Sequence, residues 1–129
     1  FVEPTHTAHA ACRADAFRLE QVFRNLLENS LRIVEGPVVC TLSCRPVQLG
    51  DTPAVQVTIR DNGPGIPADD CERIFDALFT TRPEGSWLGL AIVRRLVEAH
   101  GGTIVARPNP RGAVFHLTLP LESPAKPNP

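Results

Sequence analysis

The sequence has no excess of charge of either sign and no long apolar run. It carries 13 basic and 14 acidic residues, for a net charge of -1. A sequence-independent nucleic-acid binder would need a basic excess, and a polybasic membrane anchor is also absent. The longest apolar run covers residues 88–93, too short to cross a bilayer, and the first residues show no signal-peptide pattern. We therefore expect no nucleic-acid partner and no direct membrane contact by this domain.

The cysteine pattern does not indicate a metal site or a disulfide framework. No C-x-x-C occurs among the four cysteines, which are Cys12, Cys40, Cys44 and Cys71. Within a strand, the spacing between Cys40 and Cys44 is too wide for a shared ion or a disulfide. We expect four reduced thiols and a cytoplasmic location, with a parent protein that is either soluble or membrane-bound.

Length and proline placement predict one domain with two main helices. A chain of 129 residues with 43% hydrophobic residues can form a single core. We expect this domain to span residues 1–121, followed by a disordered, proline-rich tail over 122–129. The thirteen prolines avoid residues 15–36 and 87–107, which predicts helices in those windows.

The predicted helices have apolar residues at spacings of three and four. In the first, Asp15 is the expected N-cap and Gly36-Pro37 the stop, and the apolar stripe comprises Leu19, Val22, Phe23, Leu26, Leu27, Leu31 and Val34. In the second, over residues 88–100, the expected stripe comprises Leu88, Ile92, Leu96 and Ala99. A shorter helix is expected over residues 68–75.

Four segments have the pattern of strands. They cover residues 38–45, 54–60, 103–107 and 113–119, with loops expected over 46–53 and 80–86. Strands that occur in pairs favour a mixed, mostly antiparallel sheet over a doubly wound one. The predicted fold is α+β: a two-layer α/β sandwich with the helices on one face of the sheet.

Two asparagines on the first helix are candidate ligands. On a helical wheel, Asn25, Asn29 and Arg32 lie within about 60° of one another, away from the centre of the apolar stripe. An amide oxygen is a neutral, hard ligand suited to Mg²⁺ that already sits on phosphates, and Arg32 could meet those phosphates. Glu28 lies at the margin of this face and is a weak candidate base. The alternative is a solvated face that happens to hold two asparagines.

Two glycine-bearing segments complete the candidate site. In DNGPGIP, Asp61 at a strand end could accept from an exocyclic amine, while Gly63 and Gly65 allow close backbone approach. In EGSWLGL, Gly85 and Gly89 flank the start of the second long helix, where free amides can hold phosphates. The alternatives are an ordinary turn and an ordinary glycine-bearing helix entry.

These motifs, in this order, resemble the ATP-binding catalytic domain of sensor histidine kinases, in the superfamily shared with DNA gyrase, MutL and the large heat-shock chaperone ATPases. The resemblance covers roughly residues 15–119. QVFRNLLENSLR resembles the asparagine box, DNGPGIP the first glycine box, IFDALFTT the phenylalanine box and GSWLGLAIVRRLVEAHGG the second glycine box. The implied fold is the histidine kinase ATPase-like sandwich, or Bergerat fold.

The resemblance implies ATP and Mg²⁺ as cofactors. Asn29 would ligate the metal with support from Asn25, and Asp61 would accept from the adenine amino group. The remaining implied contacts comprise Arg32, Gly63, Gly65, Ile66, Thr80, Thr81, Arg82, Gly85, Leu88, Gly89 and Leu90. The implied activity is a protein-histidine kinase whose acceptor histidine lies on a dimerisation domain of the same kinase, before Phe1, with a response regulator downstream. By itself this piece is expected to be monomeric.

Some positions depart from the family pattern. Trp87 occupies the place of the middle glycine of the second glycine box, Ile33 replaces a frequent aromatic, and Ala77-Leu78 replaces Pro-Phe. Gyrase-like relatives have a glutamate base where this chain has Asn25, which argues against water activation. The alternative functions are a degenerate nucleotide-binding or scaffold domain, a hydrolytic ATPase of the same superfamily, and an anti-sigma-factor-type serine kinase.

Overall fold

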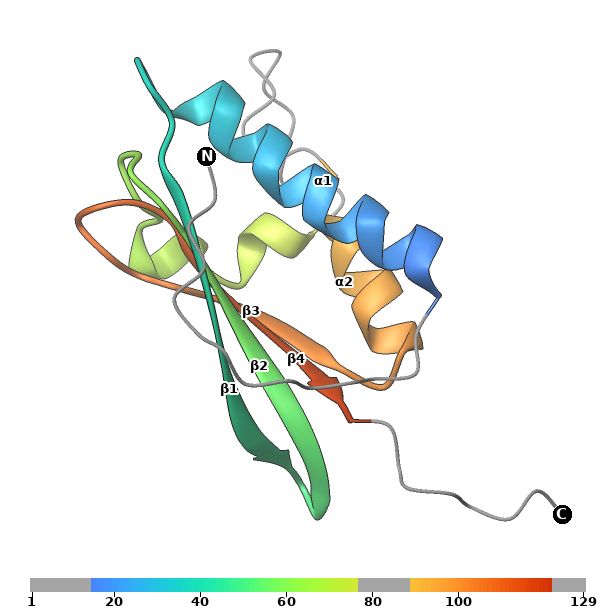
Figure 1. Cartoon of the computed structure of the whole chain (residues 1–129). Coiled ribbons are helices and arrows are strands. Elements are labelled where there is room, and N and C mark those ends of the chain that lie inside the picture. Colours follow the sequence, from blue (N-terminus) through green and yellow to red (C-terminus); the bar gives the residue numbers. More distant parts are fainter. Residues whose placement is uncertain (1–14, 77–88, 122–129) are drawn as a thin grey trace, which may run out of the picture.

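A computed structural model describes residues 15–76 and 89–121 of the chain (Figure 1). Its helices are α1 (Ala16–Ile33) and α2 (Leu90–Ala99), and two 3-10 turns, η1 (Ala68–Asp70) and η2 (Arg73–Phe75), lie between them in sequence. Its strands are β1 (Cys40–Leu49), β2 (Thr52–Asp61), β3 (Thr103–Arg107) and β4 (Val114–Pro120).

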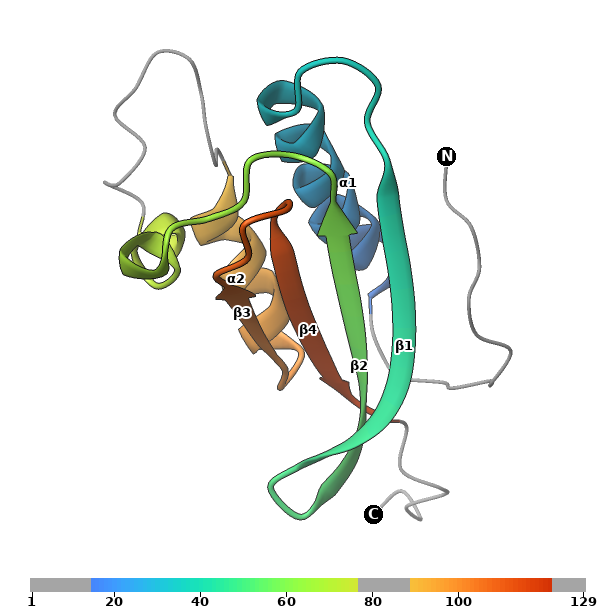
Figure 2. The same ribbon diagram turned by 90° about the vertical axis from the view of Figure 1, so that its left-hand side faces the viewer.

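The strands form one sheet in the order β1-β2-β4-β3, and each neighbouring pair is antiparallel. Both helices lie on the same face of this sheet, as Figure 1 and the rotated view in Figure 2 show. The predicted two-layer α+β sandwich is confirmed, with an antiparallel sheet over the described strands.

Helix α1 begins where the sequence predicts. The Asp15 carboxylate accepts hydrogen bonds from the backbone N–H groups of Phe17 and Arg18, satisfying two donors that the first turn would otherwise leave open. After the helix ends at Ile33, Gly36 takes a positive φ of 83° that turns the chain toward β1. The N-cap prediction is confirmed.

The loop expected over residues 46–53 is wrong. β1 continues to Leu49, β2 starts at Thr52, and the two-residue turn between them uses Gly50 at φ 61°. Pro46 pairs with Val55 within this ladder. A proline is tolerated there because β1 is an edge strand of the described sheet, where one missing N–H donor breaks no second ladder. The long β1–β2 hairpin extends past the rest of the molecule (Figures 1 and 2).

Two further expectations need correction. The short helix expected over 68–75 is the pair of 3-10 turns, η1 and η2. On α2 the buried side chains are Leu90, Val93, Leu96 and Val97, while Ile92 is 48% exposed and Ala99 is exposed. Because α2 has apolar residues on several sides, hydrophobicity alone did not identify the face that packs on the sheet.

The core lies between the helices and the sheet. Its largest fully buried apolar side chains are Leu26 and Val22 of α1, Ile74, Leu90, Val93, Val97 and Leu117. Leu31, expected in the α1 stripe, is 63% exposed instead. Among the described helices, none is long and apolar enough to cross a membrane. Cys40, Cys44 and Cys71 are free thiols, and Cys12 lies outside the described residues.

Candidate functional site

The carboxylate of Asp61 lies at the end of β2 and is only 5% exposed. Its Oδ1 accepts hydrogen bonds from the backbone N–H groups of Gly63, at 2.9 Å, and Ala113, at 2.8 Å. Its Oδ2 accepts from the Ser30 hydroxyl at 2.8 Å. An ionised carboxylate offers about four acceptor positions. These three bonds fix the carboxylate in place and leave Oδ2 with capacity for one further donor.

Glycines let the backbone come close enough to make this arrangement. Gly112 has φ 100°, and a Cβ there would overlap the carbonyl oxygen of Asp61. At Gly63 a Cβ would lie 2.9 Å from Val34 Cγ2 and 3.2 Å from Asp61 Oδ1. Gly65 has φ 86°, and a Cβ there would overlap the carbonyl oxygen of Asn109. Gly65 therefore serves the contact between two loops.

Asn29 lies inside the molecule on α1, with 0% of its surface exposed. Its Nδ2 donates to the carbonyl of Asn25 at 2.9 Å, which fixes the plane of the amide. The expectation that the amide face lies apart from the apolar stripe is wrong for Asn29. It follows Leu26 by three residues and Val22 by seven, so the same face of the helix carries all three.

The start of α2 meets the same helix. Gly89 is the N-cap of α2 and has φ 78°, and a Cβ there would lie 3.1 Å from Asn25 Nδ2. The first N–H groups of a helix have no acceptor within the helix, so they face outward at this end. Leu90 is buried in the core and anchors this turn.

Helix α1 thus connects the two other parts of the candidate site. Through Ser30, the neighbour of Asn29, it contacts Asp61 at the end of β2. Through Asn25, one turn earlier, it contacts Gly89 at the start of α2. An oriented amide, a buried carboxylate and a helix N-terminus are therefore brought together from three separate segments.

The other predicted site residues lie in different places. Arg32 and Glu28 are exposed on α1 with 3.9 Å between Arg32 Nη2 and Glu28 Oε2, and Ile66 is buried in the core. Outside the described residues lie Thr80, Thr81, Arg82, Gly85, Trp87 and Leu88.

The residues that hold Asp61 were not predicted from the sequence. Ser30, Gly112 and the N–H of Ala113 fix the carboxylate, and no role was predicted for any of them, although Ser30 stands within the segment QVFRNLLENSLR. A usable signal was present for Ser30: it directly follows Asn29, and a hydroxyl on a buried helix face needs a polar partner. Cys40 lies beside this cluster; burial raises the pKa of its thiol, and the nearby Asp61 charge also raises it, against a lowering by the Ser30 hydrogen bond. The Cys40 thiol is therefore neutral at pH 7.

The residues at this site fit a divalent cation that takes one ligand atom from the protein and others from a bound molecule. In the described ranges, no group of three His, Cys, Asp or Glu side chains gathers as a metal site. The Asn29 amide oxygen is the kind of hard, neutral donor that Mg²⁺ accepts, and the neighbouring helix N-terminus favours anions. This donor set matches a cation that brings phosphate oxygens with it.

Comparisons with known proteins identify the family of this chain. Residues 14–123 match the family described as "Histidine kinase-, DNA gyrase B-, and HSP90-like ATPase". Sensor histidine kinase ZraS of Klebsiella oxytoca is 40% identical over 126 residues, which cover 95% of this chain and 27% of that protein.

Solved structures show the same fold. The catalytic domain of histidine kinase ThkA superposes with a TM-score of 0.75 at 30% identity, covering 92% of this chain and 77% of that one. Full-length ShkA in complex with AMPPNP gives a TM-score of 0.72 at 31% identity, covering 98% of this chain and 27% of that one. The chain thus spans about a quarter of the full-length kinases it matches, and it belongs to the histidine kinase-, DNA gyrase B- and HSP90-like ATPase family.

Proposed function

We propose that this domain binds Mg-ATP and delivers the γ-phosphate to a histidine on a dimerisation domain of the same kinase. The observation that carries the proposal is the double contact of α1, with Asp61 through Ser30 and with Gly89 through Asn25. It gives one ligand a carboxylate at one end and helix amides at the other. The nucleophile would lie outside this chain, and a response regulator would receive the phosphoryl group afterwards.

At the purine end, Asp61 selects a hydrogen-bond donor. Its Oδ2 has room for one further donor, and a carboxylate cannot donate in return. An exocyclic amine, as on adenine, satisfies this position. The carbonyl oxygen that guanine carries at the same place would face the carboxylate without a proton between them, which is repulsive.

At the phosphate end, Asn29 would hold Mg²⁺ through its amide oxygen. The cation would supply charge neutralisation to the phosphates. The N–H groups around Gly89 and Leu90 would contact phosphate oxygens, with Asn25 supporting the turn. Contacts by Arg32, Gly63, Gly65, Ile66, Thr80, Thr81, Arg82, Gly85 and Leu88 remain predictions from the resemblance.

The residues favour transfer over hydrolysis. Phosphoryl transfer depends mainly on positioning and electrostatic stabilisation. Asn25 lies beside Gly89 and has an amide in place of a carboxylate, so it cannot remove a proton from water. Glu28 is the acidic residue of α1 that is nearest to Asn25 in sequence. Its side chain is exposed and lies close to Arg32. We therefore expect slow ATP hydrolysis by the isolated, monomeric domain.

Calorimetric titration with AMPPNP and Mg²⁺ tests the proposal. We expect binding by the unaltered chain, loss of the magnesium-dependent part in Asn29→Ala, and loss of most affinity in Asp61→Ala. Gln48→Ala, on the exposed hairpin, is the matched control and should bind normally. No binding by the unaltered chain would leave a scaffold domain, and rapid steady hydrolysis would favour an ATPase of the same family.

A further inference from the structure

The face of the sheet away from the helices is basic. Alternation along the strands places Arg45, Arg60 and Arg107 on this open face, and Arg111 follows in the loop before β4. All four arginines are exposed. None of the outward positions of the four described strands is acidic. The overall charge of -1 therefore conceals a positive surface on one side of the molecule.

Several arginines on the helices form ion pairs, whereas those on the open face form none among the described residues. Arg24 pairs with Glu20 at 2.8 Å, and Arg94 lies 3.5 Å from Glu72 and 3.7 Å from Glu98. Within the described part of the chain, no carboxylate pairs with the open-face arginines. Arg45 instead donates to the neutral Gln56 at 3.1 Å. Four exposed arginines that form no ion pair within the described residues favour the binding of an anionic partner.

The positive charges of these arginines affect the pKa of His116, which lies on the same face. His116 lies in β4 between Thr58 and Val105, and Thr58 Oγ1 lies 2.9 Å from its Nδ1. Burial lowers the pKa of His116, and the charges of Arg107, Arg45 and Arg60 lower it further. Three strands therefore contribute positive charge to one continuous area, in which His116 stays neutral near pH 7.

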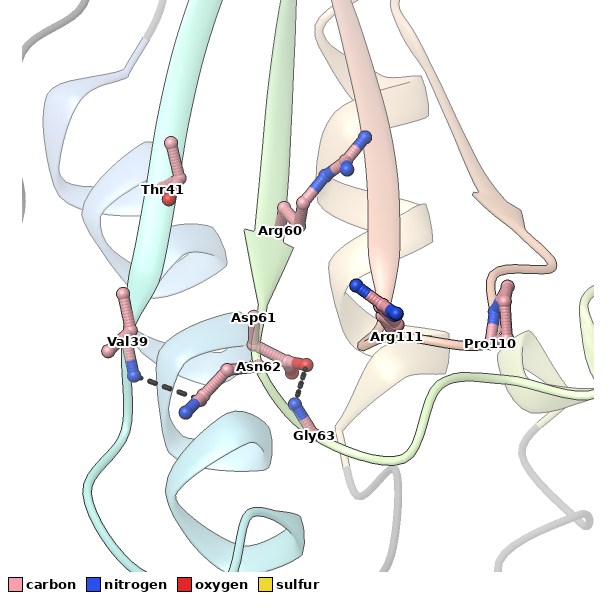
Figure 3. Close-up of a pocket in the computed structure, with 8 residues that line it drawn as sticks. All are labelled: Val39, Thr41, Arg60, Asp61, Asn62, Gly63, Pro110 and Arg111. Carbon is pink, nitrogen blue, oxygen red and sulfur yellow. Dashed lines mark hydrogen bonds between the residues drawn. The ribbon is translucent and has the colours of Figure 1, made fainter.

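A pocket at the upper rim of this face provides an anchor point. It has a volume of about 480 Å³, and its lining includes Arg60 and Arg111 together with Asp61 and Gly63 of the candidate nucleotide site. Figure 3 looks onto the open face, with both helices behind the strands, and shows Arg60 on β2 and Arg111 in the loop before β4. Asn62 shapes one wall by accepting from Val39 N at 2.9 Å and donating to Pro37 O at 3.0 Å.

We propose that this open face docks an acidic polypeptide segment, with one carboxylate seated between Arg60 and Arg111. Guanidinium groups bind carboxylates through two parallel hydrogen bonds, and all the basic residues of the face are arginines. Spaced charges across three strands fit a segment with several acidic side chains. At the pocket this surface adjoins the candidate nucleotide site, because Asp61 and Gly63 also line it. The Asp61 carboxylate itself accepts from Ser30 of α1, on the helix side of the sheet.

Other polyanions fit the same face less well. Non-specific nucleic-acid binding needs a basic excess, which the whole chain lacks, and single-stranded nucleic acid needs exposed aromatic rings for stacking. Apart from His116, the outward positions of the described strands carry no ring of that kind. An anionic membrane attracts dense runs of basic residues, whereas these arginines are separated by Thr, Ser and Val side chains.

Fluorescence anisotropy with a labelled hexaglutamate peptide, at low and physiological salt, tests the docking surface. We expect R60Q/R111Q to weaken binding at least about tenfold. The control R18Q/R24Q removes the same charge from α1 and should weaken it less than about twofold. Amide shifts on adding peptide to the full chain should gather around Arg60, Arg111 and His116.

Several results would overturn the proposal. Equal weakening by the two double variants would show general charge attraction, and no peptide binding at low salt would remove the surface altogether. Tighter binding of duplex DNA or phosphatidylserine vesicles than of the peptide would assign the face to another partner. Self-association that R60Q/R111Q abolishes would assign it to a second copy. Because none of these assays uses ATP, their outcome is independent of the proposed kinase activity.

Discussion

The two faces of the sheet handle polar groups in opposite ways. On the helix side, Asp61, Ser30 and Asn29 are buried, and hydrogen bonds hold the Asp61 carboxylate and the Asn29 amide. On the open side, Arg60, Arg107 and Arg111 are exposed and have no acidic partner among the described residues. Buried, fixed groups recognise one small ligand by shape and by donor pattern. Exposed, unpaired charges attract a partner over a distance, and this attraction weakens as the salt concentration rises.

Gly112→Ala has the largest expected effect, because Gly112 packs directly against Asp61 on the buried side. We expect Gly112→Ala to lower the free energy of unfolding by about 3 kcal/mol or more. A Cβ at this position would overlap the carbonyl oxygen of Asp61, and alanine would also have to adopt the positive φ of Gly112. Urea denaturation measures this loss. Gly50→Ala is the matched control: φ is 61° and no atom lies within 4 Å of the new Cβ, so the cost should be about 1 kcal/mol. Equal losses would show that backbone strain alone, without the contact, sets the cost.

Asp61→Asn tests the same side through its ligand. The asparagine oxygen can still accept from Gly63 and Ala113, so we expect the fold to survive. Its NH₂ group would face the purine amine, donor against donor, and affinity for AMPPNP should fall about 100-fold, a cost of about 3 kcal/mol. Calorimetry measures it, with Asp51→Asn on the exposed hairpin as the control. Unchanged affinity would place the purine elsewhere.

The fold was predictable where local signals agreed with packing. Proline-free windows and the Asp15 cap predicted α1, and alternation in β2 predicted a strand. The errors arose where tertiary position decides. Pro46 is tolerated because β1 lies at the edge of the described sheet, and the buried face of α2 depends on which side meets the sheet. Neither the edge location of β1 nor the buried face of α2 can be predicted from the sequence of that segment alone.

The candidate site was predictable in its motifs but not in its supports. Asp61, Asn29 and Gly89 were predicted from their residue types, and the structure brings their segments together. Ser30, Gly112 and Ala113 N–H were missed because their role depends on a contact between distant segments, 31 and 52 residues apart for the Asp61 bonds to Ser30 and Ala113. The unpaired arginines could not be predicted either, because pairing depends on which face each strand residue occupies.

Ser30→Ala sharpens the comparison by removing one bond on the buried side. The Asp61 carboxylate would lose the hydroxyl that holds Oδ2 while its Oδ1 bonds remain. We expect a loss of about 1–2 kcal/mol in unfolding free energy and about tenfold weaker AMPPNP binding. Ser43→Ala, an exposed serine on the open side of β1, is the control and should change neither. Normal affinity in Ser30→Ala would mean that the backbone donors suffice to place Asp61.

The smallest expected effect belongs to His116 on the open side. Burial first, and the nearby arginines second, lower its pKa below the ordinary 6.5 in the folded protein. The unfolded chain therefore takes up a proton first as the pH falls, so His116 favours folding fully above about pH 6.5 and loses this contribution below it. Urea midpoints between pH 7.5 and 5.5 should fall less steeply in His116→Gln than in the unaltered chain. Raising the salt concentration should shrink the difference only in part, because salt screens the exposed arginines but leaves the burial of the ring unchanged. Parallel pH profiles for the two proteins would show that neither burial nor the nearby arginines lower the pKa of His116 in the folded protein, and would weaken the contrast between the two faces.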